Sequence, residues 1–154
     1  MSVPKSVVRF RKDGIEYTSS VDRASYTILE LTRAALRDSG KFITRTANSA
    51  AMKLPGLKKS RRVRGRTSTF LYNVPWAKKG LPHLEVGVKH GTWYGEQQEL
   101  GTSQQPKRQI LRNSVYNNIP QIVEIQSRYL SALEDEAKAL RLISEEEYTG
   151  GGDD

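Results

Sequence analysis

The sequence predicts one α+β domain: a long N-terminal helix on a small antiparallel sheet, an N-terminal β-hairpin and C-terminal helices. Two stretches, one beginning near residue 21 and one near residue 119, repeat apolar residues at helical spacing. Between them, apolar and polar residues alternate as in half-buried strands. At 154 residues the chain can bury a core without a metal or disulfide.

Composition narrows the function classes. The net charge of +8 favours nucleic acid or an acidic protein as a partner. A mean hydropathy of −0.62 is low for a self-contained globule and indicates arms, loops or a partner-dependent surface. The absence of cysteine excludes zinc–thiolate sites. Neither a signal peptide nor an apolar run of about 20 residues is present, so we expect no membrane contact and synthesis in the cytoplasm.

The first predicted element is a hairpin over residues 6–18. Val8 and Phe10 precede Asp13-Gly14, and Ile15 follows it. Asp-Gly supplies the positive φ angles that a tight hairpin turn requires. Since a two-stranded hairpin is marginal alone, it should pack on the body or on a neighbouring subunit.

A long helix follows the hairpin. Ser39-Gly40 resembles a helix stop, yet the apolar stripe continues almost in phase beyond it. The sequence therefore predicts one helix, or two nearly collinear ones, kinked near Gly40 and ended by Pro55-Gly56. The stripe consists of Val21, Ala24, Ile28, Leu31, Ala35, Phe42, Ile43, Ala47, Ala50 and Leu54.

A basic loop over residues 57–66 comes next. Six like charges within nine residues repel one another, so the loop is either solvated and mobile or in contact with nucleic acid or an acidic partner. It contains no aromatic residue, which counts against a platform for stacking bases. The charged residues are Lys58, Lys59, Arg61, Arg62, Arg64 and Arg66.

The middle of the chain predicts an antiparallel sheet. Residues 67–74 are rich in β-branched and aromatic side chains, and Leu84, Val86 and Val88 alternate with less apolar residues. After a turn at Gly91, the segment at Trp93 is expected to form a third strand. The long helix should cover the apolar face of this sheet.

The segment from Trp93 to Val115 then predicts a strand–turn–helix unit. Gly101 should take an unusual φ, and the Thr102 hydroxyl should tie the turn. A polar loop to Pro106 leads into a helix over residues 107–117. Trp93 and Tyr94 are either partly buried core or interface anchors.

A last amphipathic helix should begin at Pro120, which suits a first turn, and run to Leu140. The acidic end of the chain contains Glu145, Glu146 and Glu147. The sequence therefore predicts one domain over residues 1–146 and a disordered acidic tail over residues 147–154.

Few residues are candidates for catalysis or ligation. His83 and His90 are expected to be ordinary surface or hydrogen-bonding histidines. His90 could be combined with Glu96 and Glu99 as a metal site, but their spacing matches no ligand pattern. The glycines form no phosphate-binding motif and no serine stands in a nucleophile elbow. We expect no enzyme activity, cofactor or metal.

With these residues described, the chain resembles the small head–tail joining proteins of bacteriophages with long, non-contractile tails, called neck, tail-completion, tail-terminator or minor tail proteins. The resemblance spans residues 21–140, but its specific part is about twenty residues: Tyr94, then Glu99-Leu100-Gly101-Thr102-Ser103, then Pro106, then Ile110-Leu111-Arg112. The basic loop is longer than is usual in that family, and Lys107-Arg108-Gln109 replaces a common aromatic.

The resemblance implies a virion structural protein at the head–tail junction. Such proteins form a ring, usually a hexamer, between the head connector or stopper protein and the tail tube protein, with genomic DNA in the lumen. Lys58 to Arg66 would then lie at a rim or in the lumen. Trp93, Tyr94, Glu99, Leu100, Gly101 and Thr102 would pack the subunit or its neighbour.

Two alternatives remain open. A basic nucleic-acid-binding protein would contact DNA phosphates through the same six charges, with an affinity that falls steeply with salt. A small enzyme is the third possibility; it would depend on His90 or Glu99, and the sequence offers no substrate for it.

Overall fold

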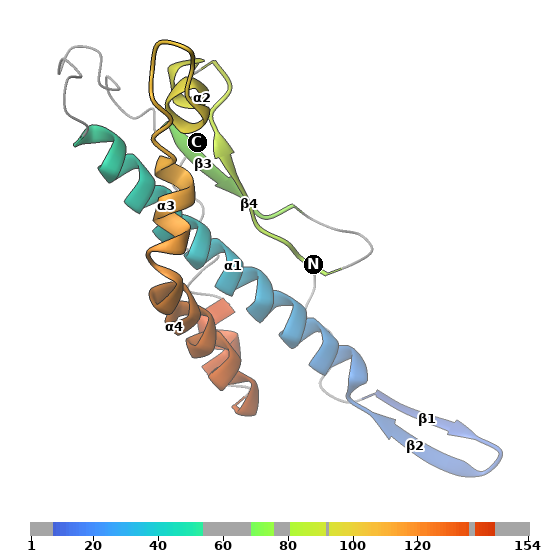
Figure 1. Cartoon of the computed structure of the whole chain (residues 1–154). Helices are drawn as coiled ribbons and strands as arrows, with labels where there is room; N and C mark the ends of the chain where they lie inside the picture. Colours follow the sequence, from blue (N-terminus) through green and yellow to red (C-terminus); the bar gives the residue numbers. More distant parts are fainter. Residues whose placement is uncertain (1–7, 54–68, 76–80, 92, 136–137, 144–154) are drawn as a thin grey trace. The chain divides into compact units, whose positions relative to one another are not determined.

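The computed structural model describes residues 8–53, 69–75, 81–91, 93–135 and 138–143 (Figure 1). Its contacts divide the chain into two compact units. Unit 1 comprises Met1–Ala35 and Ser127–Asp154, and unit 2 comprises Leu36–Gln126. The α+β class, with a long N-terminal helix, a hairpin, a small antiparallel sheet and C-terminal helices, agrees with the sequence prediction.

Unit 1 begins with the predicted hairpin. Strand β1 (Val8–Lys12) pairs antiparallel with β2 (Ile15–Ser19). The turn between them has φ of 54° at Asp13 and 81° at Gly14, the positive values expected for a two-residue hairpin turn. Neither strand pairs with any other described strand.

Helix α1 (Val21–Met52) is continuous over 32 residues. The boundary between the units falls within it, so its residues up to Ala35 belong to unit 1 and those from Leu36 belong to unit 2. No break occurs at Gly40, although Ser39-Gly40 resembles a helix stop in the sequence. Close packing explains why a glycine stands at this position in the helix. A Cβ at Gly40 would lie 2.6 Å from Cδ2 of Tyr72 and 2.9 Å from Cδ1 of Leu84. Gly40 therefore allows the sheet to approach the helix closely.

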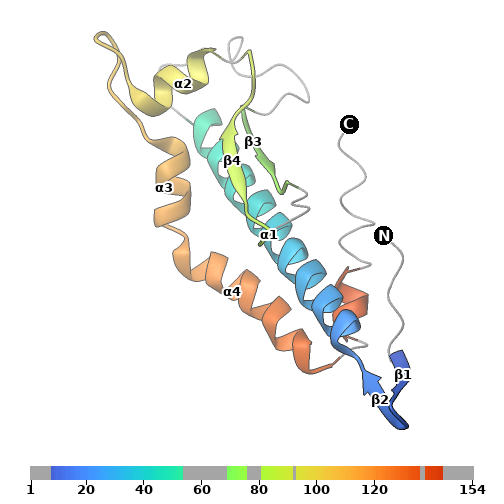
Figure 2. The same ribbon diagram turned by 90° about the vertical axis from the view of Figure 1, so that its right-hand side faces the viewer.

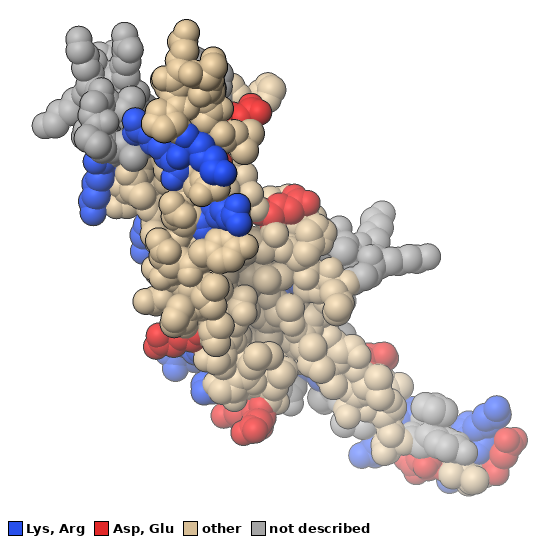
Figure 3. Space-filling view, in the orientation of Figure 1, with Lys and Arg blue, Asp and Glu red and all other residues tan. Residues whose placement is uncertain are grey.

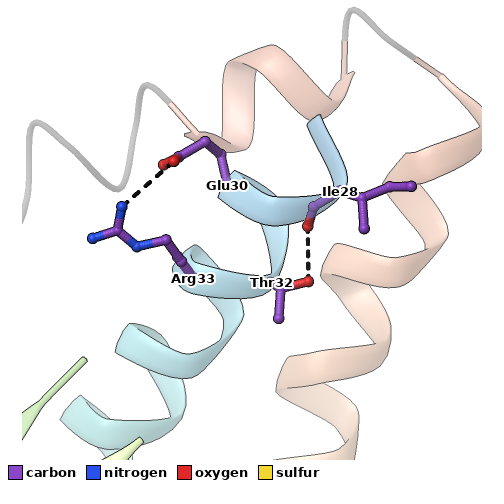
Figure 4. A network of polar contacts seen from close by, with 4 residues as sticks. All are labelled: Ile28, Glu30, Thr32 and Arg33. Carbon is purple, nitrogen blue, oxygen red and sulfur yellow. Dashed lines mark hydrogen bonds and ion pairs between the residues drawn. The ribbon is translucent and has the colours of Figure 1, made fainter. Parts of the chain in front are cut away.

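In unit 1, only part of the predicted apolar stripe of α1 is buried. Leu31 and Ala35 are buried, whereas Val21 is 66% exposed and Ile28 is 52% exposed. The unit also buries an ion pair within α1, where Nη1 of Arg33 lies 3.4 Å from Oε1 of Glu30 (Figure 4). The other buried apolar residues of this unit are Ala34, Tyr129, Ala132, Ala139 and Ile143.

In unit 2, strand β3 (Phe70–Asn73) pairs antiparallel with β4 (Glu85–Val88), with Phe70 opposite Val88. Side chains of β4 alternate between exposed and half-buried, as the sequence predicts. Helix α1 covers this sheet, as expected (Figure 2). Asn48 Nδ2 donates to the Phe70 carbonyl (3.1 Å), and Asn48 Oδ1 accepts from the Phe70 N–H (3.0 Å).

The prediction of a third strand at Trp93 is wrong. The segment forms helix α2 (Trp93–Leu100), and the sheet has two strands. The aromatic pair at its start favours a strand, but five consecutive good helix formers follow from Glu96 to Leu100. The strand–turn–helix unit is therefore a helix–turn–helix.

Two helices follow in unit 2: α3 (Ile110–Tyr116) and α4 (Ile119–Leu130), the second of which crosses into unit 1. The predicted helix to Leu140 is interrupted. A 3-10 helix, η2 (Ser131–Glu134), is followed by extended backbone at Asp135, with φ −129° and ψ 106°.

Asp135 explains this interruption. Its carbonyl accepts from the Ala139 N–H (2.9 Å), and its Oδ1 accepts from the Lys138 N–H (3.3 Å). This is the geometry of a helix N-cap, so Asp135 begins a separate helical turn that is described at residues 138–143.

Several predictions concern residues outside the described ranges. These are the end of the long helix at Pro55-Gly56, the basic loop over residues 57–66 and the acidic tail over residues 147–154. Among the helices described, none combines the length and apolarity needed to cross a membrane.

Candidate functional site

The candidate site is the turn that connects α2 to α3, where the residues of the family-like motif lie. Its central contact is the Glu99 carboxylate, at the end of α2. Oε2 accepts from the Leu111 N–H (2.9 Å), and Oε1 accepts from the Arg112 N–H (3.1 Å). The first N–H groups of a helix lack partners within the helix and carry partial positive charge. Glu99 therefore caps α3 and fixes where it begins.

Glu99 caps α3 from a distance, because the residue directly before the helix does not cap it. Gln109 precedes α3 but makes no side-chain capping bond, and its backbone has φ 50° and ψ 46°. The left-handed conformation is unfavourable for a residue with a Cβ. The Arg108 N–H donates to the Gln98 carbonyl (2.9 Å), which holds the two ends of the connection together.

Gly101 and Thr102 form the turn as the sequence predicts. Gly101 has φ +79°, and its N–H donates to the Gln97 carbonyl (2.8 Å) at the end of α2. The Thr102 hydroxyl accepts from the N–H groups of Gln104 (3.3 Å) and Gln105 (3.1 Å). A Cβ at Gly101 would lie 2.8 Å from the Lys107 nitrogen, so the chain returns too close to this position for a side chain.

Large side chains are exposed on either side of this turn. Leu100 is 67% exposed and Tyr116 is 61% exposed. The guanidinium of Arg112 lies 5.3 Å from the centre of the Tyr116 ring, a cation–π distance. Tyr and Arg are enriched among the residues that dominate binding at protein interfaces. The turn thus has an ordered backbone frame, with exposed large side chains beside it.

The other predicted site residues are only partly described. Trp93 and Tyr94 lie in the first turn of α2, and their side chains are outside the description. All six residues of the basic cluster, Lys58 to Arg66, lie outside the described ranges. Their predicted contacts therefore stay predictions.

Sequence reasoning missed the role of Glu99 as a cap, because its partners lie 12 and 13 residues further along the chain. It also did not name Glu85 as the partner of His83, whose Nε2 lies 3.2 Å from Oε1 of Glu85. The alternation of the strand provides a signal for that pair, since residues two apart lie on the same face.

The proposed combination of His90, Glu96 and Glu99 is not brought together as a metal site. No group of three His, Asp or Glu side chains within the described ranges could hold a metal ion. The chemistry that the site does show is backbone capping, a close backbone approach and an exposed aromatic–cation pair.

Comparison of the chain with known protein-family models, with curated proteins and with solved structures gives no match.

Proposed function

We propose that the protein is a virion structural protein of a tailed bacteriophage that forms a ring between the head connector and the tail. One observation carries the proposal: Glu99, Gly101 and Thr102, three residues of the motif that resembles the family, hold the turn between α2 and α3 in one arrangement. Glu99 caps α3, Gly101 allows the close return of the chain, and Thr102 ties the turn between them.

The exposed surface supports an assembly role. Tyr116, Ile119 and Val123 are 61%, 48% and 55% exposed on α3 and α4 of unit 2. On the hairpin of unit 1, Ile15 is 57% exposed. A ring subunit needs two different surfaces, because head-to-tail contacts join one face of each copy to another face of the next. Apolar side chains on both units are compatible with that requirement.

Electron microscopy of the purified protein, with its size measured by light scattering, tests the ring. Closed rings, or rings that form when head or tail particles are added, would support the proposal and give the copy number. A monodisperse monomer that ignores both particles would contradict it.

The basic loop provides a second test. The triple variant Arg61→Ala, Arg62→Ala, Arg64→Ala should fold normally and attach fewer tails to heads. A matched triple variant removes the same charge from exposed positions elsewhere: Arg45→Ala, Lys53→Ala and Lys138→Ala. Normal tail attachment by the first variant, or equal loss in both, would contradict a specific role for the loop.

The second candidate is a basic protein that binds DNA phosphates, which the net charge of +8 favours. Its affinity should fall steeply as salt rises, with a log–log slope of about −0.9 for each phosphate neutralised. Titration of duplex DNA at several salt concentrations checks this. An affinity that hardly changes with salt would exclude the phosphate mechanism.

A further inference from the structure

A pocket of about 290 Å³ lies in unit 2, lined by α1, by α3 and by residues at both ends of α3. Thr46 and Ala50 of α1 contribute to it, together with Ile110 of α3. Arg108 lines the pocket as well, and so do Asn113, Asn117 and Asn118. The pocket therefore combines hydrocarbon, amide groups and a guanidinium.

Among the described residues that line the pocket, none supplies a counter-charge to the guanidinium of Arg108. Its Nη1 atom is buried and has no hydrogen-bond partner among the described residues. No acidic residue lines the pocket, and no Asp or Glu stands in the sequence between Glu99 and Glu124. The Glu99 carboxylate already accepts two backbone N–H groups of α3. Because no acidic side chain of the pocket lining balances the Arg108 charge, the site favours an anionic ligand.

The surroundings of Arg108 are basic as well. Lys107 precedes it and Arg112 follows four residues later, and Lys and Arg side chains lie close together around the start of α3 (Figure 3). A guanidinium binds either a carboxylate or a phosphate with two parallel hydrogen bonds. The apolar wall at Ala50 and Ile110 selects a carboxylate on a hydrocarbon stem, as in glutamate, over a phosphate, which has no such stem.

We propose that this pocket, named here the Arg108 pocket, binds a glutamate from the acidic C-terminal segment of a neighbouring copy of the chain. That segment follows Ile143, which is buried in unit 1. When extended, residues 144–154 span at most about 36–40 Å. They include five of the 17 acidic residues of the chain: Glu145, Glu146, Glu147, Asp153 and Asp154.

The choice of a neighbour rests on the proposed ring. A head-to-tail contact requires a donor surface and an acceptor surface at different places on one chain. The acidic segment continues unit 1, and the Arg108 pocket lies in unit 2. Each copy would then give its segment to one neighbour and receive the segment of the other.

Binding of a fluorescent peptide with the sequence of residues 143–154 to the full-length protein, followed by anisotropy, tests the pocket. Arg108→Gln should weaken binding at least tenfold. Arg11→Gln, the same change at an exposed arginine of the hairpin, should weaken it less than threefold. Equal effects of the two changes, or no binding by the wild type, would overturn the proposal.

A second peptide, with glutamine at positions 145–147, completes a double-mutant cycle between Arg108 and the peptide carboxylates. Arg108→Gln should scarcely affect its binding, because the partner carboxylates are already gone. An unchanged tenfold loss would mean that Arg108 acts on the protein alone and would overturn the contact. If Arg108→Gln fails to fold, Ala50→Leu provides a second variant: it fills the pocket at an exposed helical position and should block the peptide. Unimpaired binding by Ala50→Leu would contradict the pocket.

Two further measurements identify the source of the ligand. Inorganic phosphate that displaces the peptide at the same concentration as free glutamate would overturn the choice of a carboxylate on a stem. Light scattering of full-length wild type, Arg108→Gln and Glu145→Gln/Glu146→Gln/Glu147→Gln should show weaker self-association in both variants. Peptide binding that depends on Arg108, without any such weakening, would overturn the assignment to a neighbour.

The outcomes separate this inference from the proposed function. Rings that form equally well in wild type and Arg108→Gln would refute the inference and leave the ring intact. Peptide binding by the Arg108 pocket in a protein that never forms rings would refute the ring and the assignment to a neighbour, while the pocket would remain a carboxylate site.

Discussion

Gly101→Ala is the sharpest test of the clamped turn. An alanine at φ +79° carries the strain of the left-handed region, about 1–2 kcal/mol. Its Cβ would also lie 2.8 Å from the Lys107 nitrogen and 3.0 Å from the Lys107 Cα. These are backbone atoms, so the clash can be relieved only by moving the chain, at about 1–3 kcal/mol. The expected total loss is about 2–5 kcal/mol in the free energy of unfolding.

Gly91→Ala is the matched control. Gly91 has φ +83° and also lies in unit 2, but a Cβ there would meet nothing within 4 Å. It should therefore lose only the strain contribution, about 1–2 kcal/mol. The difference between the two variants isolates the close approach at Lys107.

Urea unfolding followed by circular dichroism measures both variants. For a chain of this length each kcal/mol lowers Tm by about 2–4 °C, so thermal unfolding gives an independent check. If Gly101→Ala is no less stable than Gly91→Ala, to within about 0.5 kcal/mol, the contact with Lys107 does not constrain the turn and the reasoning is refuted.

Three other predictions concern unit 2, each measured by urea unfolding. Asn48→Ala should cost about 2–4 kcal/mol, because it leaves both backbone groups of Phe70 without their partner; a loss below 1 kcal/mol would contradict this. Glu99→Ala should cost about 0.5–2 kcal/mol by uncapping α3, and Glu99→Gln, which keeps one acceptor oxygen, should cost less; the reverse order would contradict the cap. Gly40→Ala should destabilise despite the better helix propensity of alanine, because its Cβ would meet the Tyr72 ring at 2.6 Å; a gain in stability would refute that close packing.

The parts of the fold that the sequence predicts are those with local causes. The hairpin follows from Asp13-Gly14, because only a few residues accept the φ angles of that turn. The burial pattern of β4 follows from alternation along four residues. At the candidate site, the conformation of Gly101 and the bonds of the Thr102 hydroxyl follow from residue type, and both are confirmed.

The parts that the sequence does not reveal depend on distant or competing contacts. The cap of α3 joins Glu99 to residues 12 and 13 positions further along the chain, and no local sequence pattern predicts it. At Trp93, aromatic side chains and helix-forming neighbours favour different structures, and the helix prevails. Asp135 stands in a continuous helical pattern, yet its side chain offers an alternative partner to the backbone and divides the helix.

The return of the chain between α2 and α3 has a practical consequence for labelling. The bond from the Arg108 N–H to the Gln98 carbonyl holds together the ends of the segment formed by residues 99–107. The tip around Gln104 is exposed, and lengthening a loop whose ends are already held adds only a slowly growing entropic cost. A small epitope or a metal-binding tag inserted between Ser103 and Gln104 should leave both helices in place. It would mark each copy of the purified protein in electron micrographs.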